Sequence, residues 1–219
     1  MKKLQTVTLG CSKNKVDTEH ILSQVEDLYE IVPEGEDIPV HTILLNTCGF
    51  IGDAKEESIE MILSMAQAKK RRKIGKLIVM GCLSERYREE LKTEIPEVDA
   101  FYGKFDWVNL ANDLFQDSVS TENQRVITTP SHYAYIKIAE GCNRTCSYCA
   151  IPIITGKYKS RTIESIVEEV KMLVANGVKE FQVIAQDLSF YGLDNYKRLA
   201  LPDLIKRLSD IKGVEWLRL

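Results

Sequence analysis

Short apolar runs alternate with stretches of helical periodicity along most of the chain. In the first half, the runs predict strands at residues 4–9, 42–45, 76–80 and 98–102. Apolar spacing after the first strand predicts a helix with one face formed by Ile21, Leu22, Val25, Leu28 and Tyr29. A second helix is expected to be capped by Asp53 and Glu56 and to bury Ile59, Ile62, Leu63 and Ala66. Further helices are expected from about Ser84 and up to about Phe115.

The polar segment 116–131 lacks this periodicity and is interpreted as a linker. After it, strands are predicted at 133–138, 181–185 and 214–219. A helix that begins near Ile163 is expected to end at Gly177, and another is expected to begin at Pro202 and to end by Gly213. Strands that alternate with helices are typical of a parallel sheet covered on both faces. We therefore expect domains at 1–115 and 132–219, joined by the linker.

Composition narrows the class of protein. The 219 residues are 44% hydrophobic and 28% charged, which is ordinary for a globular protein with a real core. The net charge of −3 disfavours a protein that depends on non-specific nucleic-acid contacts. No apolar run approaches the roughly 20 residues of a membrane helix, and the polar start is unlike a signal peptide. We expect a cytoplasmic protein without membrane contact, in which six cysteines indicate metal or redox chemistry rather than disulfides.

Three of the cysteines stand in one loop with the spacing C-x3-C-x2-C. They are Cys142, Cys146 and Cys149 in the segment EGCNRTCSYC. Thiolates are the ligands that iron–sulfur clusters require, and three of them leave one iron of a four-iron cluster open to another ligand. A structural zinc site is the alternative, but such a site needs four closed ligands and no histidine is adjacent. The loop therefore predicts an iron–sulfur cluster with an open position.

The other three cysteines, Cys11, Cys48 and Cys82, are far apart in sequence, yet each follows an apolar strand. In an open parallel sheet the loops after the strands converge on one crevice, so these thiols can meet at a second metal centre. Buried cysteines are also common in protein cores, so three inert side chains remain the alternative. Asn14 and Asp17 are candidates to line this second site, and Asn14 is equally a candidate helix cap.

The loop spacing, with Tyr148 before the last cysteine, resembles the signature of the radical S-adenosylmethionine (SAM) superfamily. The resemblance implies a [4Fe–4S] cluster whose open iron is chelated by SAM, and whose reduction cleaves SAM to a 5′-deoxyadenosyl radical. It also implies that Tyr148 packs near the adenine of SAM, although a core aromatic under the loop is the alternative. Three further residues are candidate cofactor contacts because of their positions: Arg161 before a helix near the loop, and Gln186 and Asp187 at a strand's carboxyl end.

The segments GCSKNKVDTE, LLNTCGFI and GCL together resemble the amino-terminal domain of the methylthiotransferases. This resemblance covers essentially the whole chain. It implies an α/β fold, with a Rossmann- or flavodoxin-like parallel-sheet domain followed by the first part of a radical SAM βα partial TIM barrel. It also implies that Cys11, Cys48 and Cys82 hold a second [4Fe–4S] cluster that carries the sulfur to be inserted.

Two branches of that family act on different substrates. One modifies an adenosine in transfer RNA (MiaB-like), and the other modifies the β-carbon of an aspartate in the twelfth small-subunit ribosomal protein (RimO-like). Ser12-Lys13-Asn14 after Cys11, the loop KIAEGCNRTCSYCAIP and the segment Ala185-Gln186-Asp187 look like the ribosomal branch. The implied protein is a monomeric transferase that needs an electron donor, with nucleic acid not its direct substrate. No catalytic side chain is assigned, and a non-catalytic iron–sulfur protein is the alternative of a different class.

The length conflicts with a complete enzyme. A full βα barrel takes about 250 residues, whereas only three strands are predicted after residue 131. The resemblance implies that the rest of the barrel and a small carboxyl-terminal β-barrel are missing. We therefore expect an exposed sheet edge and little or no turnover by this chain.

Overall fold

The computed structural model describes all residues except 37, 107–108, 111, 113 and 115–123. The chain divides into two compact units, which we call unit 1 (Met1–Thr121) and unit 2 (Glu122–Leu219). The helix expected up to about Phe115 and the first half of the expected linker fall largely outside the described residues. Residues 124–131 carry no helix or strand. No helix in the described parts is long and apolar enough to cross a membrane.

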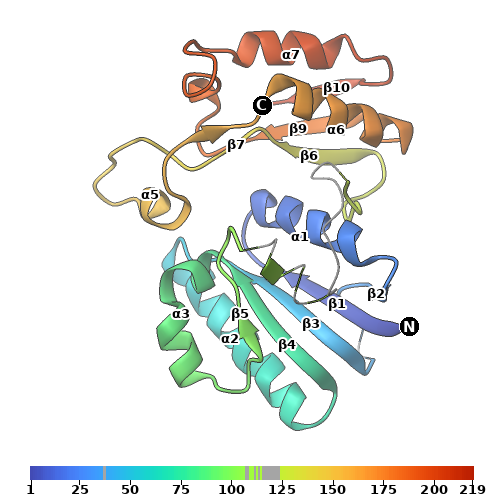
Figure 1. Ribbon diagram of the computed structural model, residues 1–219, viewed down its shortest axis with the longest axis vertical. Helices are drawn as coiled ribbons and strands as arrows, with labels where there is room; N and C mark the ends of the chain where they lie inside the picture. Colours follow the sequence, from blue (N-terminus) through green and yellow to red (C-terminus); the bar gives the residue numbers. More distant parts are fainter. Residues whose placement is uncertain (37, 107–108, 111, 113, 115–123) are drawn as a thin grey trace. The chain divides into compact units, whose positions relative to one another are not determined.

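Unit 1 is built on a five-stranded parallel sheet (Figure 1). Its strands are β1 (Lys2–Thr8), β2 (Tyr29–Val32), β3 (Val40–Thr47), β4 (Ile74–Gly81) and β5 (Ala100–Phe101). They lie in the order β2-β1-β3-β4-β5, which is the flavodoxin-like order of a doubly wound sheet. The expected α/β fold class is thus confirmed. Because the order reverses between β1 and β3, a ligand crevice is expected at the carboxyl ends of these strands.

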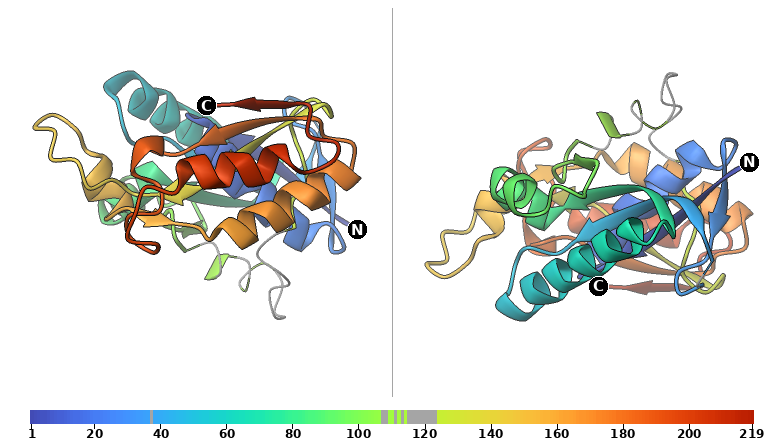
Figure 2. Two further views of the ribbon diagram at one scale, coloured as in Figure 1. Left: turned by 90° about the horizontal axis from the view of Figure 1, so that it is seen from above. Right: turned by 90° about the horizontal axis from the view of Figure 1, so that it is seen from below.

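Three helices in the described part of unit 1 cover this sheet. Helix α1 (Ser12–Val25) lies on one face, and α2 (Gly52–Lys70) and α3 (Cys82–Glu94) lie on the other (Figures 1 and 2). The core under α2 and α3 contains Ile43, Leu45 and Val79 from the strands, packed with Ile62 of α2. These side chains are at most 3% exposed, so the apolar runs that predicted the strands do form the buried layer.

The sequence prediction for unit 1 is wrong about the end of the first helix and the cap of the second. The first helix ends at Val25, and Tyr29 begins β2, where it pairs with Lys2 of β1. Tyr-Glu-Ile-Val favours a strand, and this preference prevails over an apolar spacing that only mimicked a helix. Helix α2 has Ile51 as its N-cap with no side-chain cap, and Asp53 lies in the first turn, where its charge complements the helix dipole.

Unit 2 contains a three-stranded parallel sheet in the order β10-β9-β6. The strands are β6 (Tyr133–Lys137), β9 (Glu180–Ile184) and β10 (Trp216–Arg218), and α6 (Ile163–Ala175) and α7 (Leu201–Ser209) pack on one face (Figure 2). Phe181 and Tyr191 are fully buried in its core. Helix α6 ends before Gly177, whose φ of +94° suits glycine, as predicted. As expected, the last strand lies at an edge of the sheet.

Short elements that the sequence did not predict surround the cysteine loop of unit 2. Strands β7 (Ala139–Glu140) and β8 (Lys159–Ser160) pair antiparallel. Helix α5 (Ile151–Thr155) follows the loop, and the 3-10 helix η1 (Leu188–Phe190) follows β9. Because β7 and β8 pair with each other, the two ends of the segment that contains the cysteine loop lie side by side.

Candidate metal and cofactor sites

The three cysteines of unit 1 lie at the carboxyl edge of its sheet. Cys11 is the N-cap residue of α1, Cys48 directly follows β3, and Cys82 is the first residue of α3. Because β1, β3 and β4 are neighbours in the sheet, their carboxyl ends bring these residues together beside the reversal of strand order. All three thiols are free, and Cys11 and Cys48 are close enough to Cys82 to influence its pKa. We call these residues the unit 1 trio.

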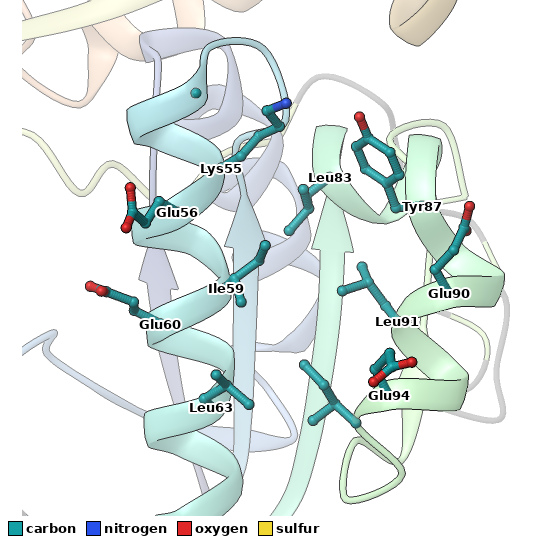
Figure 3. Close-up of a pocket in the computed structure, with 12 residues that line it drawn as sticks. Lys55, Glu56, Ile59, Glu60, Leu63, Leu83, Tyr87, Glu90, Leu91 and Glu94 are labelled. Carbon is teal, nitrogen blue, oxygen red and sulfur yellow. The ribbon is translucent and has the colours of Figure 1, made fainter.

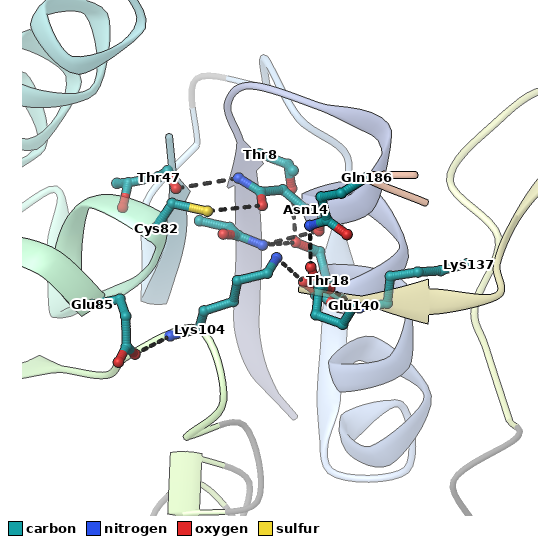
Figure 4. A network of polar contacts seen from close by, with 12 residues as sticks. Thr8, Asn14, Thr18, Thr47, Cys82, Glu85, Lys104, Lys137, Glu140 and Gln186 are labelled. Carbon is teal, nitrogen blue, oxygen red and sulfur yellow. Dashed lines mark hydrogen bonds and ion pairs between the residues drawn. The ribbon is translucent and has the colours of Figure 1, made fainter. Parts of the chain in front are cut away.

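Asn14 joins the loops that carry this trio (Figure 4). Its side chain is buried, and its Nδ2 donates hydrogen bonds to the carbonyl oxygens of Leu9, at 3.0 Å, and Thr47, at 3.2 Å. Its Oδ1 accepts a weak hydrogen bond from the Cys82 thiol, with the sulfur 3.8 Å away. Of the two roles left open by the sequence, Asn14 therefore lines the site, and the cap position belongs to Cys11.

Burial raises the pKa of the Cys82 thiol to about 11, and the nearby Lys104 opposes the rise. A metal ion would overcome this barrier, because a coordinated thiol is deprotonated outright. Two polar atoms beside the trio, Asn46 Oδ1 and Ser84 Oγ, are buried without a hydrogen-bond partner in the described part of the chain. Three thiols fit an iron–sulfur cluster with one open iron better than a closed zinc site, which needs four protein ligands.

The trio is not a preassembled ligand set. Within the described ranges, no three His, Cys, Asp or Glu side chains are already arranged to hold a metal ion. The backbone around the thiols is nevertheless fixed: the Cys48 amide donates to Ser58 Oγ at 3.0 Å, and that hydroxyl donates to the Cys48 carbonyl oxygen at 3.1 Å. The structure therefore brings the three segments to one edge and leaves their ligand role as a prediction.

Gly10 keeps open the space next to Cys48. Its φ is +87°, and a Cβ placed there would lie 2.6 Å from Cys48 Cβ and 2.9 Å from its sulfur. We expect Gly10→Ala to displace Cys48 and to lower the iron bound by unit 1, measured as iron per chain after anaerobic reconstitution. Gly35→Ala is the matched control, because Gly35 has a φ of +91° but a Cβ added to it would meet nothing within 4 Å. Equal iron loss in both variants would contradict the steric argument.

A groove on the surface of unit 1 does not contain the trio. It lies between α2 and α3, has a volume of about 830 Å³, and is lined by residues such as Ile59, Leu63, Leu83 and Glu60 (Figure 3). Ile59 and Leu63 were predicted to be buried, but they are 39% and 45% exposed because α2 and α3 leave this gap over the sheet. The groove is therefore separate from the candidate metal site.

The cysteines of unit 2, which we call the unit 2 trio, lie in the loop between β7 and α5. The Cys142 amide donates to the Gly156 carbonyl oxygen at 3.1 Å, which closes the loop, and the Cys149 amide donates to the Cys146 carbonyl oxygen at 3.1 Å. The Arg144 amide donates to the sulfur of Cys142 at 3.4 Å. Hydrogen bonds of this kind to sulfur tune the potential of iron–sulfur clusters. Cys146 is exposed, so the loop fits a cluster with an accessible iron.

The predicted cofactor contacts of unit 2 lie in three different environments. Tyr148 is 90% exposed, and the alternative of a buried core aromatic is therefore wrong for this structure. Asp187 accepts hydrogen bonds from Ser189 and from Arg144 Nε, at 2.8 Å in the latter case, and both hold the pKa of its carboxyl below the usual range. Gln186 donates to Glu140, while its buried Oε1 has no partner among the described residues. A contact with SAM stays a prediction for Gln186 and Asp187.

Arg161 has structural partners already. It ion-pairs with the fully buried Glu169, donates to the Lys137 carbonyl oxygen at 3.0 Å and donates to Ser165 Oγ at 2.9 Å. Its side chain is 25% exposed. The guanidinium therefore ties β6, β8 and α6 together, and a contact with SAM stays a prediction for this residue.

The sequence assigned no individual role to two residues near these sites, although Arg144 belongs to a basic segment around the unit 2 trio. Lys104 lies close to the unit 1 trio, and Arg144 links the unit 2 trio to Asp187. Arg144 lies between Cys142 and Cys146 in the sequence, so its position already indicated a place near the proposed cluster. Lys104 gave no such indication, because it is far from every cysteine in sequence.

Comparison with known proteins finds one matching family for the segment that carries each trio. Residues 3–103 match a family described as "Uncharacterized protein family UPF0004", and residues 136–215 match the radical SAM superfamily. The chain is 59% identical over 221 residues to a protein of Parabacteroides distasonis named ribosomal protein uS12 methylthiotransferase RimO. This match covers 99% of the chain and 51% of the relative. Over nearly its whole length, the chain is similar to radical SAM methylthiotransferases.

A second relative also carries the name of the RimO-like branch. A protein of the same name from Porphyromonas gingivalis is 58% identical over 219 residues, covering 99% of the chain and 50% of the relative. The resemblance drawn from the cysteine motifs is thus confirmed, and both relatives are named for the ribosomal substrate. The chain spans about half the length of the curated relatives it matches.

Solved structures with the same fold include two radical SAM enzymes. The cobalamin-dependent enzyme OxsB superposes with a TM-score of 0.60 at 11% identity, covering 99% of this chain and 38% of that chain. The methyltransferase TsrM from Kitasatospora setae superposes with a TM-score of 0.57 at 14% identity, covering 97% and 53%. At these identities the likeness shows the fold alone.

Proposed function

We propose that this chain is the cluster-bearing part of an enzyme that converts a C–H bond at the β-carbon of an aspartate in ribosomal protein uS12 into a C–SCH3 group. The observation that carries the proposal is the division of six free cysteines into two trios, one in each unit. Such a carbon has no useful acidity, so acid–base chemistry cannot activate it and radical chemistry is required. The relatives named for uS12 methylthiolation support this substrate.

Each trio would hold one [4Fe–4S] cluster. When bound, the cluster of the unit 2 trio with SAM supplies the radical, and the cluster of the unit 1 trio supplies the anchor for the inserted sulfur. The loop of the unit 2 trio keeps its accessible thiol toward solvent at Cys146, which leaves space for SAM. Asn14 and Ser58 hold the backbone of the unit 1 trio in place.

Four side chains of unit 2 are proposed to contact SAM: Tyr148, Arg161, Gln186 and Asp187. The exposed ring of Tyr148 can stack on the adenine, and the unpartnered Oε1 of Gln186 can accept a hydrogen bond from an amino group. Asp187 is ionised at neutral pH because its pKa is lowered, so it can accept from the ribose or the amino group of SAM. The proposed setting is a cytoplasmic monomer with an external electron donor.

Iron analysis tests the two-cluster proposal. We expect about eight irons per chain after anaerobic reconstitution, and about four in Cys48→Ala, because each cluster holds four. About four irons in the parent chain, unchanged by Cys48→Ala, would contradict it. For the substrate, mass spectrometry of uS12 from cells with and without the gene should show a methylthio group only in the former. A change in transfer RNA modification instead would assign the protein to the other branch.

A further inference from the structure

A buried lysine stands beside the unit 1 trio. Lys104 follows β5, and its side chain is only 2% exposed. Its ammonium group forms an ion pair with Asp17 of α1 at 3.0 Å (Figure 4). A buried lysine is costly, so a fold that keeps one close to three thiols places its charge where water screens it poorly.

The backbone around Lys104 is held rigidly. Its amide donates to Glu85 Oε2 of α3 at 2.9 Å, and the amide of the preceding Gly103 donates to Asp106 at 2.9 Å. Asp106 in turn pairs with Arg88 of α3. Helix α3 begins at Cys82, so the helix that carries this cysteine also fixes the lysine.

The ion pair lies next to the hydrogen-bonded network of Asn14 that reaches the Cys82 thiol (Figure 4). Asp17 lies about one turn further along α1 than Asn14, which itself contacts Cys82.

We propose that the buried charge of Lys104 stabilises the more negative oxidation state of a cluster held by the unit 1 trio. Lys104 acts on the cluster through its charge and not as a ligand. This inference rests on the proposed function, because it requires a cluster on Cys11, Cys48 and Cys82. Net charge near a cluster is one of the factors that set its reduction potential. A fixed cation raises the potential, and Asp17 moderates the effect.

The test is a potentiometric titration followed by electron paramagnetic resonance. The full chain is used with Cys142, Cys146 and Cys149 replaced by serine, so that only the unit 1 cluster is observed. Lys104→Met should shift the midpoint potential to more negative values, whereas Asp17→Asn should shift it to more positive values. Lys104→Arg should retain the potential of the parent. Lys92→Met is the matched control, because Lys92 is an exposed lysine of α3 paired with Glu89.

Opposite shifts separate electrostatics from structure, because a merely structural ion pair would respond in the same way to the loss of either partner. Shifts of the same sign, or no shift beyond that of Lys92→Met, would overturn the proposal. Should Lys104→Met fail to retain iron, the sign of the Asp17→Asn shift decides alone. If the parent with serine in unit 2 binds no cluster, the two-cluster function fails, and this outcome is distinct from an unshifted potential.

Discussion

Glu169→Ala is expected to lower the free energy of unfolding of unit 2 by about 3–5 kcal/mol, a large part of the usual stability of a domain. The Glu169 side chain is fully buried in α6, and its two carboxylate oxygens pair with Arg125 and Arg161. Arg125 is also fully buried, so its guanidinium would lose the carboxylate of Glu169 while staying in the core. Because Arg125 donates to the Tyr135 carbonyl oxygen at 2.6 Å, the loss would also loosen β6.

Urea denaturation followed by hydrogen exchange in peptides of β6 and β9 measures this change in unit 2 alone. Glu215→Ala is the control, because Glu215 pairs with Lys179 at 2.8 Å with both side chains more than half exposed. It should cost less than about 1 kcal/mol. Glu169→Gln preserves the shape without the charge and should also destabilise unit 2. An effect of Glu169→Ala no larger than that of Glu215→Ala would contradict the buried-charge argument.

The positions of the cysteines could be predicted because they depend on local patterns. Each member of the unit 1 trio follows an apolar run, and the alternation of strands and helices already implies a parallel sheet whose loops converge. The unit 2 trio is contained in eight residues, so no long-range information is needed. In contrast, the edge strand β2 was missed because Tyr29 continues the apolar spacing of α1, and only its pairing with β1 shows it to be a strand.

Buried charges could not be predicted from the sequence. Lys104 and Asp17 are 87 positions apart, and nothing near either residue signals that they meet. Glu169 occupies a position in α6 that looks like part of a charged surface, yet it is fully buried between two arginines. Arg161 was placed correctly near the cysteine loop, but its main partner could not be known before Glu169 was seen to be buried. Pairing of distant charges is a property of the assembled fold.

Cys146→Ala is expected to abolish the formation of 5′-deoxyadenosine from SAM in the presence of a strong reductant. The unit 2 trio supplies only three thiolates, so a four-iron cluster that keeps one iron open for SAM has no spare protein ligand. Loss of Cys146 therefore removes either the cluster or its correct attachment. Cys48→Ala is the matched control, because it removes a ligand from the unit 1 trio and leaves the loop of unit 2 intact.

The two variants separate the proposed roles of the clusters. Cys48→Ala should still cleave SAM but should not support the insertion of sulfur into uS12, whereas Cys146→Ala should do neither. Liquid chromatography with mass spectrometry detects 5′-deoxyadenosine and the methylthio group in the same sample. Equal loss of SAM cleavage in both variants would show that the trios act as one centre. Formation of 5′-deoxyadenosine by the parent chain, even at a low rate, would exclude a pure iron–sulfur carrier, since a carrier transfers electrons without breaking the bond between sulfur and the deoxyadenosyl carbon.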